Sequence, residues 1–213
     1  MNNDFQDFFG KPESTLKSLF DEVEYPWQML EKLPAFLESL PLGTLQGALD
    51  PKASVNDLSK LYLGKNSEIG PNVLIEGAVY IGNNVKIKHA AYLRGPLFIE
   101  DGCVIGHASE IKHSIFFAGA TAAHFNYVGN SVLGKEVQLG AGATCANLRF
   151  DKKNIIIRTF SHRLQTEHRK MGAFIGQGAQ VGCQAVLSPG CIIAQEAQVP
   201  PLTGVKGFFE RIK

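Results

Sequence analysis

Between residues 63 and 127 the apolar residues recur at every sixth position. Counted from Leu63, the chain makes eleven such units, and nine of their first residues are Leu or Ile. The fifth residue of each unit is mostly small or β-branched, as at Val73 and Cys103, and the second residue is often Gly or acidic. A period of six fits neither the 3.6-residue repeat of an amphipathic helix nor the alternation of a plain strand.

This repeat is typical of a coil in which short, flat strands are joined by tight corners. Three units make one triangular turn, so residues 18 apart lie one above the other at the usual strand spacing of about 4.8 Å. The aliphatic first residue fills the interior, the small fifth residue fits a cramped inside position, and glycine gives the backbone freedom near the corners. We therefore predict an all-β fold, a parallel β-helix, over residues 63–200.

Two stretches break the repeat. The unit that starts at Ala123 is predicted to contain only four residues, because the pattern resumes at Tyr127 and continues in a new phase through Leu133, Leu139 and Cys145. Residues 148–173 depart from the pattern, which then returns in phase, so they are predicted to form an inserted loop or hairpin. This loop holds seven Lys or Arg residues against two acidic ones. Such a charge run is usually a solvated surface, but it could also hold phosphates.

The ends of the chain lack the six-residue repeat. Residues 1–62 are predicted to form a mainly helical extension or linker, and residues 201–213 a C-terminal tail. A proline suited to a first helical turn, Pro26, precedes apolar residues at helical spacing. Pro34 is expected to limit or kink that helix. We expect the extension to pack on the coil or against a neighbouring subunit.

The composition narrows the location and the class of partner. A formal net charge of +1 over 213 residues gives no general reason to expect nucleic acid or an anionic membrane as a partner. The N-terminus has no basic region followed by an apolar run, and no apolar run approaches the ~18 residues of a membrane span. A cytoplasmic protein is therefore expected.

The four cysteines form no CxxC pair. Three of them fall on inward positions of the repeat, which favours small buried residues in a reducing compartment. Cys145 lies near the site described below, which leaves a nucleophilic role as an alternative, although no general base is paired with it. The cysteines are Cys103, Cys145, Cys183 and Cys191.

Stacking by 18 residues brings charged side chains together. Arg94 and Lys112 are both second residues of their units and would stack on the outer surface. Two adjacent cations repel each other unless an acid or an anion lies between them, and a phosphate would meet that need. Two long side chains extended into water are the alternative.

Histidines stack in the same way. His89 and His107 are 18 residues apart, and His124 is the second residue of the unit at which the repeat breaks. An outward histidine ladder is the simplest interpretation, and no convincing set of metal ligands accompanies it. Because departures from a chain's own pattern tend to mark functional sites, His124 is a candidate functional residue.

The repeat resembles that of the hexapeptide-repeat proteins, which fold as left-handed parallel β-helices. The stretches HFNYVG, from His124, and LGAGATCANLRFDKK, from Leu139, resemble a more specific site. It is that of the C-terminal acetyltransferase domain of the bifunctional enzymes that make UDP-N-acetylglucosamine. GAGATCANLRFD followed by RKMGAFIG is closer still to the archaeal-type sugar-1-phosphate nucleotidylyltransferase/amino-sugar acetyltransferases. The resemblance covers roughly residues 63–200.

The resemblance assigns roles to residues of this chain. It implies that His124 is the general base and that the other residues bind the amino sugar, its phosphate or the acetyl donor, acetyl-CoA. The amino sugar would contact Tyr127, Gln138 and Asn147; its phosphate would contact Arg94, Lys112 and Lys153, with Lys152 as an alternative; and acetyl-CoA would contact Ala141, Gln177 and Ala194.

The chain departs from the family at three points. Bacterial members usually have asparagine where Gln138 stands and serine where Gln177 stands, which bears on the orientation of the sugar and on the thioester contact. No G-x-G-T-x-M-type nucleotide loop is present, so the chain is not expected to make UDP-sugars alone.

The expected activity is acetyl transfer from acetyl-CoA to the 2-amine of glucosamine 1-phosphate or galactosamine 1-phosphate, in a homotrimer and without a metal. One alternative is a non-catalytic trimer that binds a sugar phosphate or supports a separate nucleotidylyltransferase. Another is a metalloenzyme like the γ-class carbonic anhydrases, hexapeptide-repeat proteins that hold zinc with histidines between subunits.

Overall fold

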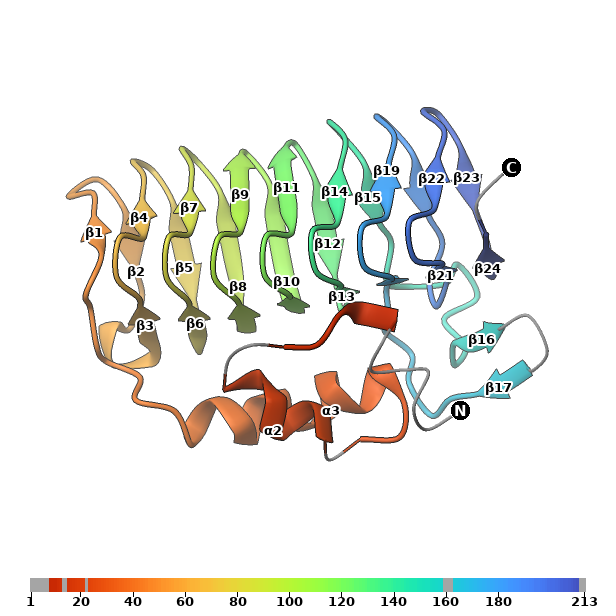
Figure 1. Cartoon of the computed structure of the whole chain (residues 1–213), viewed down its shortest axis with the longest axis horizontal. Helices are drawn as coiled ribbons and strands as arrows, with labels where there is room; N and C mark the ends of the chain where they lie inside the picture. The colour runs from red at the N-terminus through yellow and green to blue at the C-terminus, as the bar shows by residue number, and fades with distance from the viewer. Residues whose placement is uncertain (1–7, 13–14, 22, 159–162, 211–213) are drawn as a thin grey trace.

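The computed structural model describes residues 8–12, 15–21, 23–158 and 163–210. Most of these residues wind into a long coil of short strands, seen from its side in Figure 1, with two helices lying along the lower side of the coil. Each strand pairs in parallel with the strands of the turns before and after it. The predicted all-β fold, a parallel β-helix with a helical N-terminal extension and an inserted loop, is confirmed.

The strands form three flat faces, which we name A, B and C. The long strands β8 and β10 bend around one corner and contribute to both B and C. Face A consists of β1 (Ala48–Leu49), β4 (Glu68–Ile69), β7 (Lys86–Ile87), β9 (Val104–His107), β11 (Thr121–His124), β14 (Gln138–Leu139), β19 (Gln180–Val181) and β22 (Gln198–Val199). Face B consists of β2 (Ser54–Val55), β5 (Leu74–Glu76), the first half of β8 (Tyr92–Ile99), the first half of β10 (Glu110–Phe116), β12 (Tyr127–Gly129), β15 (Thr144–Cys145), β20 (Val186–Leu187) and β23 (Gly204–Val205). Face C consists of β3 (Leu61–Leu63), β6 (Val79–Ile81), the second halves of β8 and β10, β13 (Val132–Leu133), β18 (Phe174–Ile175), β21 (Ile192–Ile193) and β24 (Phe208–Phe209).

The coil extends beyond the boundaries expected from the sequence. Strands β1 to β3 form a turn that ends at residue 63, and β23 and β24 continue the coil after residue 200. The first turn has its own apolar residues six apart, at Leu49, Val55 and Leu61. Its register differs from that of the later turns, because Leu49 pairs with Ile69 at an offset of 20. A short 3-10 helix, η1 (Leu58–Lys60), lies within this turn.

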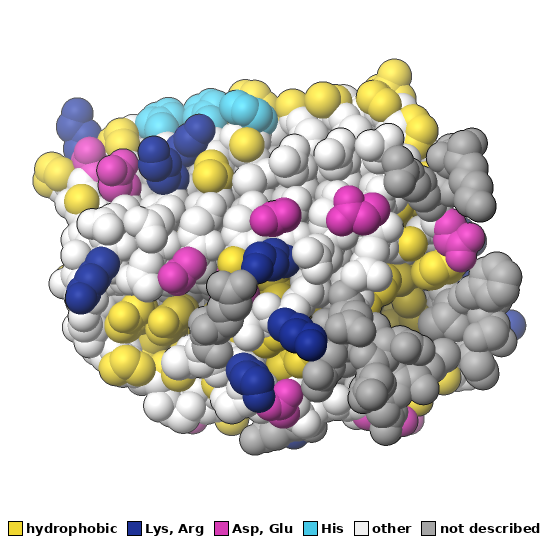
Figure 2. Space-filling model, in the orientation of Figure 1, with side chains coloured by type: hydrophobic (Ala, Val, Ile, Leu, Met, Phe, Trp, Pro, Cys, Tyr) yellow, Lys and Arg dark blue, Asp and Glu magenta, His cyan; other side chains and the backbone are white. Residues whose placement is uncertain are grey.

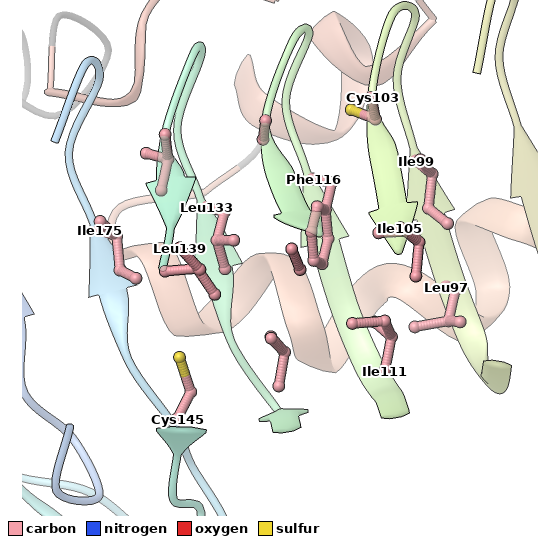
Figure 3. Packing of buried hydrophobic residues seen from close by; sticks show 14 of the residues in the cluster. Leu97, Ile99, Cys103, Ile105, Ile111, Phe116, Leu133, Leu139, Cys145 and Ile175 are labelled. Atoms are coloured by element: carbon pink, nitrogen blue, oxygen red, sulfur yellow. The ribbon is translucent and has the colours of Figure 1, made fainter. Parts of the chain in front are cut away.

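The interior of the coil is filled by the first residue of each unit, as predicted (Figure 3). The position of the phase break, however, was predicted wrongly. Two units lose one residue each, rather than one unit losing two. The register offset falls from 18 to 17 between Lys112 and Ser114, and the next turn keeps 17. The inward residues are therefore Phe116 and Ala122, not the adjacent Phe117 and Ala123.

The corners locate the two shortened units. One residue at most corners has a positive φ, and from Gly102 to Gly142 these residues recur every sixth position except for two intervals of five. The two intervals end at His113 (φ 43°) and Asn130 (φ 49°), which lie on adjacent turns between faces B and C. The break is therefore at the B–C corner and not at the A–B corner that carries His124.

The glycines at second positions have a different role from the one expected. Gly64, Gly82 and Gly106 have no positive φ; the corners that require it are mostly occupied by other residues, often Asn. A Cβ atom at Gly106 would lie 1.5 Å from the carbonyl oxygen of Ala123 on the next turn. These glycines are needed because successive turns approach too closely for a side chain.

Two helices of the N-terminal extension, α2 (Leu16–Asp21) and α3 (Pro26–Glu38), cover face C. Phe98, Ile115 and Phe174 on the outside of this face are fully buried against them. The expectation that Pro34 limits or kinks the helix is corrected in one respect, since α3 continues through Pro34 to Glu38. Burial of the apolar stripe that includes Leu33 and Leu37 stabilises this last turn. Neither helix is long and apolar enough to span a membrane, and no other described helix is.

The inserted loop folds back toward the same helices. Its hairpin, β16 (Ile156–Arg158) and β17 (Arg163–Gln165), is antiparallel. Ile155, Ile157 and Met171 are buried in the cluster that contains the helices. His168 Nε2 also lies 2.7 Å from Glu31 Oε1 on α3. The N-terminal extension therefore packs against face C and also contacts the base of the inserted loop.

Truncation of an interior side chain should destabilise the coil strongly. Phe116 is fully buried in the interior, and Phe116→Ala is expected to lower the free energy of unfolding by about 3–5 kcal/mol. Phe150 is fully exposed in the inserted loop, so Phe150→Ala is the control and should change stability by less than about 0.5 kcal/mol. Urea unfolding of both variants measures the difference, and equal losses would contradict the assignment of Phe116 to the interior.

Candidate active site

A column of side chains follows the corner between faces A and B. His89, His107 and His124 occupy it on successive turns, and His124 and His107 are register partners. The rings of His89 and His107 stack with their Nδ1 atoms 3.0 Å apart, as the spacing predicted. Figure 2 shows the histidines in a row along the upper edge of the coil. We call these three residues, with the exposed Phe125 beside them, the histidine corner.

The next position of the same column is Ala141, one turn beyond His124. The backbone N–H of Gly142 donates to the carbonyl oxygen of His124 at 2.9 Å, which fixes the two turns against each other. The N–H of Ala141 has no hydrogen-bond partner in the described part of the chain. The structure therefore brings together His124 and the backbone N–H that the resemblance assigns to the acetyl donor.

A buried asparagine holds this corner in place. Asn126 is only 2% exposed, and each of its polar side-chain atoms is hydrogen-bonded. Its Oδ1 accepts from the N–H of His124 at 3.1 Å, and its Nδ2 donates to the carbonyls of Gly140 (2.8 Å) and Ala143 (3.2 Å). Loss of such a satisfied buried amide would leave several backbone groups unpaired. Asn126 therefore joins the backbone at His124 to the backbone on both sides of Ala141 on the next turn.

The outer surface of face B carries the predicted phosphate ligands. Lys112 and Arg94 are register partners on adjacent turns, as the 18-residue spacing predicted. A residue that the sequence reasoning missed lies beside them: Glu110 accepts a hydrogen bond from Arg94 Nη1 at 2.7 Å. Glu110 thus partly neutralises the cation pair. The spacing had suggested either an acid or an anion at this position, and the acid is present.

Of these two cations, Arg94 forms an ion pair with Glu110, whereas Lys112 forms none with the described residues. Partial burial, followed by the charges of Arg94 and Lys170, lowers the pKa of Lys112. Lys170 belongs to the inserted loop, where it bridges to Leu148, and the sequence reasoning also missed it. The lowered pKa of Lys112 thus reflects partial burial first and the neighbouring cations second, and a bound anion would offset both effects.

Lys153 is exposed in the same loop, and its backbone N–H donates to Asp151 Oδ1 at 3.2 Å. Asp151 also accepts two hydrogen bonds from Arg149, at 2.8 and 2.6 Å. These bonds, with Arg149 as the main contributor, lower the pKa of Asp151. The loop turn is therefore ordered by its own charges, and no described contact joins the Lys153 side chain to Arg94 or Lys112.

Tyr127 and Asn147 converge beside Lys112. Their side chains both lie over Gly129, the register partner of Lys112. A Cβ atom at Gly129 would lie 2.6 Å from Asn147 Nδ2 and 2.7 Å from the Tyr127 hydroxyl. Partial burial and then the charge of Glu110 raise the pKa of Tyr127, so its hydroxyl stays protonated at neutral pH. Face B thus presents a polar patch, made of Arg94, Glu110, Lys112, Tyr127 and Asn147.

Gln138 lies on a different surface, the outside of face A. It is the register partner of Thr121 and Gln180, and it lines a groove of about 740 Å³. The groove also includes Ala123 and Gly140, so it begins next to the histidine corner. His124 therefore stands between the groove on face A and the polar patch on face B.

Gln177 and Ala194 lie at the corner between faces C and A. The N–H of Gln177 donates to the carbonyl of Phe8 at 2.8 Å, and the N–H of Ala194 donates to that of Phe209 at 2.9 Å. Within one chain the structure does not join these two residues to the histidine corner. Their assignment to acetyl-CoA stays a prediction.

Burial determines which cysteine thiols can react. Cys103, Cys145 and Cys191 are buried, as expected for inward positions, and Cys183 is exposed. Burial raises the pKa of Cys145 to about 12, so its thiol is not ionised at neutral pH. Across the described residues, no cluster of three His, Cys, Asp or Glu side chains is arranged to hold a metal ion.

Thiol titration should separate the cysteines. We expect Ellman's reagent to react with one thiol of the native protein, that of Cys183, and with all four after denaturation, because only an accessible thiolate reacts readily. Cys183→Ser should abolish the native reaction. A rapid native reaction that remains in Cys183→Ser and disappears in Cys145→Ser would instead support the nucleophilic alternative.

Comparison with known proteins gives matches along most of the chain. The family profile described as the GMPPB C-terminal domain matches residues 75–158. A bifunctional sugar-1-phosphate nucleotidylyltransferase/acetyltransferase of Sulfurisphaera tokodaii is 38% identical over 90 residues, which are 42% of this chain and 22% of that protein. The bifunctional protein GlmU of Methanococcus maripaludis is 30% identical over 184 residues, 86% of this chain and 44% of that protein.

Solved structures also align with the chain. A GDP-perosamine N-acetyl transferase from Caulobacter crescentus, in complex with CoA and GDP-perosamine, is 20% identical with a TM-score of 0.40, over 70% of this chain and 53% of that one. A UDP-N-acetylglucosamine acyltransferase is 18% identical with a TM-score of 0.43, over 80% and 71% of the two chains.

The chain spans less than half of the length of the two curated relatives, and the longer match includes most of the coil. The resemblance stated from the sequence is therefore confirmed: this chain is similar to part of the bifunctional sugar-1-phosphate nucleotidylyltransferase/acetyltransferases and carries a match to the GMPPB C-terminal domain.

Proposed function

We propose that the protein transfers an acetyl group from acetyl-CoA to the amine of a hexosamine 1-phosphate, glucosamine 1-phosphate or galactosamine 1-phosphate. The observation that carries the proposal is the position of His124 between two surfaces of different character. The polar patch on face B combines cations with hydrogen-bonding side chains, which suits a sugar phosphate. The groove on face A begins at the same corner and suits an extended thioester.

The phosphate would bind to Arg94 and Lys112, with a further cation from the inserted loop, Lys153 or Lys170. Lys112 supplies a charge that no described acid neutralises by an ion pair. Tyr127 and Asn147 would contact the sugar hydroxyls. Fixing the phosphate positions the amine at the corner, and this restriction of freedom accounts for part of the rate acceleration.

The chemical step is nucleophilic attack of the neutral amine on the thioester carbonyl. A hexosamine amine is largely protonated near neutral pH and must lose that proton to solvent before it attacks. Neutral His124 would then accept a second proton from the nitrogen as the N–C bond forms. The N–H of Ala141 would donate to the oxyanion of the tetrahedral intermediate. The C–S bond then breaks, and the CoA thiolate recovers a proton from the imidazolium. No covalent enzyme intermediate is required.

The assembly we propose is a homotrimer. Face C is covered by the chain's own helices, whereas faces A and B are open. A neighbouring chain would cover the groove and could supply the contacts assigned to Gln177 and Ala194, which one chain does not bring to His124. Light scattering should give three times the chain mass of 23.2 kDa, and a monomer with full activity would contradict this assembly.

The activity itself is tested by following free thiol during incubation with acetyl-CoA and each hexosamine 1-phosphate. Release that depends on the amino sugar and on His124 supports the transferase. Binding of the sugar phosphate without thiol release would favour the non-catalytic alternative, in which the trimer supports a separate nucleotidylyltransferase. The bifunctional names of the relatives also suggest such a partner for an active enzyme, since it would consume the acetylated sugar phosphate.

A further inference from the structure

The two shortened units of the coil carry a line of hydrogen bonds that leads to the polar patch. His113 and Asn130 stand at the B–C corner on adjacent turns, and Asn130 Nδ2 lies 3.2 Å from His113 Nδ1. On the far side, His113 Nε2 lies 2.8 Å from the carbonyl oxygen of Leu30 in helix α3. On the near side, Asn147 Nδ2 donates to Asn130 Oδ1 at 2.7 Å.

The first acceptor in this line, the carbonyl oxygen of Leu30, has no partner within helix α3 because of the sequence of that helix. In an α-helix the carbonyl of residue 30 would accept from the N–H of residue 34. Residue 34 is Pro34, which has no N–H, yet the helix continues past it to Glu38. The carbonyl of Leu30 is therefore available to an outside donor, and His113 supplies it.

The chemistry of the groups allows one arrangement along the line. A carbonyl oxygen only accepts, so His113 Nε2 carries the proton and neutral Nδ1 is an acceptor. Asn130 must then present its Nδ2 donor to His113, which leaves its Oδ1 facing Asn147. Asn147 must present Nδ2, and its amide is thereby fixed in one of two possible rotations close to the Tyr127 hydroxyl.

The backbone of these residues is held by other contacts. The carbonyl of Asn147 accepts from the N–H of Met171 at 2.9 Å, and that of Asn130 accepts from the N–H of Gly172 at 2.8 Å. The corner itself is closed by the bond from the N–H of Asn130 to the carbonyl of Lys112, 2.8 Å. The side-chain line is therefore not needed to keep the turns together, and its main effect is on the orientation of Asn147.

We propose that His113 and Asn130 are positioning residues for the amino-sugar site and that they fix the rotation of the Asn147 amide from helix α3. The inference rests on the proposed function in so far as Asn147 contacts the sugar. It gives the N-terminal extension a role in substrate recognition, because the line begins at Leu30. It also gives a reason why the coil loses one residue at two successive corners, since this places His113 and Asn130 side by side.

Asn130→Leu tests the line with little change in volume. The leucine can neither accept from Asn147 Nδ2 nor donate to His113 Nδ1, so the Asn147 amide is free to rotate. We expect the KM for hexosamine 1-phosphate to rise roughly three- to tenfold, the loss of one or two hydrogen bonds, with kcat within a factor of two and the KM for acetyl-CoA unchanged. Asn72→Leu is the matched control, because Asn72 is an exposed corner residue with φ 57°, and Leu202 (φ 59°) shows that leucine can occupy such a corner.

Nitrogen-15 NMR gives a readout that does not need activity. The wild-type His113 ring should be the neutral Nε2–H tautomer, and Asn130→Asp should shift it toward the doubly protonated form because a carboxylate then faces Nδ1. The side-chain amide protons of Asn147 should exchange faster with solvent in Asn130→Leu than in Asn72→Leu, because leucine offers them no acceptor. An inactive wild type would refute the proposed function and leave these spectra to decide the inference.

Two results would overturn it. One is a His113 ring in the Nδ1–H tautomer in the wild type. The other is unaltered Asn147 exchange in Asn130→Leu, together with a sugar KM no higher than that of Asn72→Leu where activity is measurable.

Discussion

Replacement of His124 by alanine is expected to lower kcat for thiol release by about 10²–10⁴-fold, the usual contribution of a positioned general base. The KM for the sugar phosphate should change little, because the polar patch lies on the neighbouring face and is built from other residues. The fold should persist. The His124 side chain is exposed, and the corner is held by Asn126 and by the backbone bond from Gly142.

The matched control is His89→Ala. His89 belongs to the same histidine corner and is stacked on His107, so its loss tests whether the ladder as a whole contributes to activity. We expect His89→Ala to retain kcat within a factor of two or three of the wild type. A His124→Ala enzyme with wild-type kcat would exclude the mechanism proposed above, and equal losses in both variants would point to a structural role of the ladder.

The architecture could be predicted from the sequence because one physical demand repeats in every turn. The interior of the coil needs an aliphatic side chain every sixth residue, and Ile75, Ile87 and Ile105 meet that demand. A fixed repeat also predicts which residues stack. For that reason the Arg94–Lys112 and His89–His107 pairs could be named in advance.

The phase of the repeat could not be followed through residues 113–130, for two reasons. Phe117 was counted as an interior residue because it is apolar, but it packs outside the coil against Phe9 and Phe20 of the extension. Two inside positions of this region are polar, Ser114 and Asn126, and both are buried with hydrogen bonds. Apolar periodicity cannot separate these cases, because burial against a helix and burial inside the coil select the same residue types.

Those residues of the candidate site that belong to the coil could be predicted from the repeat. The residues that the inserted loop and helix α3 contribute could not. Glu110 could have been found from the stacking, since it pairs in register with Tyr92 and Tyr127 on face B. Lys170 and the carbonyl of Leu30 approach the site from the inserted loop and from α3. No periodic offset relates them to the coil, so their positions depend on tertiary packing alone.

Lys112→Ala should raise the KM for hexosamine 1-phosphate by about 10–100-fold, as expected for the loss of a hydrogen bond between charged groups. The site already holds Arg94 next to Glu110, so Lys112 contributes the cation that no described ion pair neutralises. Removal of that charge should have a much smaller effect on the KM for the free hexosamine, because that substrate has no phosphate. The difference between the two substrates therefore isolates the phosphate contact from any general effect on folding.

Lys86→Ala is the control, because Lys86 is an exposed lysine on a different face of the coil, face A. It should leave both KM values unchanged. The effect of Lys112→Ala should also fall at high salt, since added ions screen the attraction between Lys112 and the phosphate in the wild type. If the KM for free hexosamine rises as much as that for the phosphate, Lys112 does not bind the phosphate, and the cation in contact with it must be sought in the inserted loop, at Lys153 or Lys170.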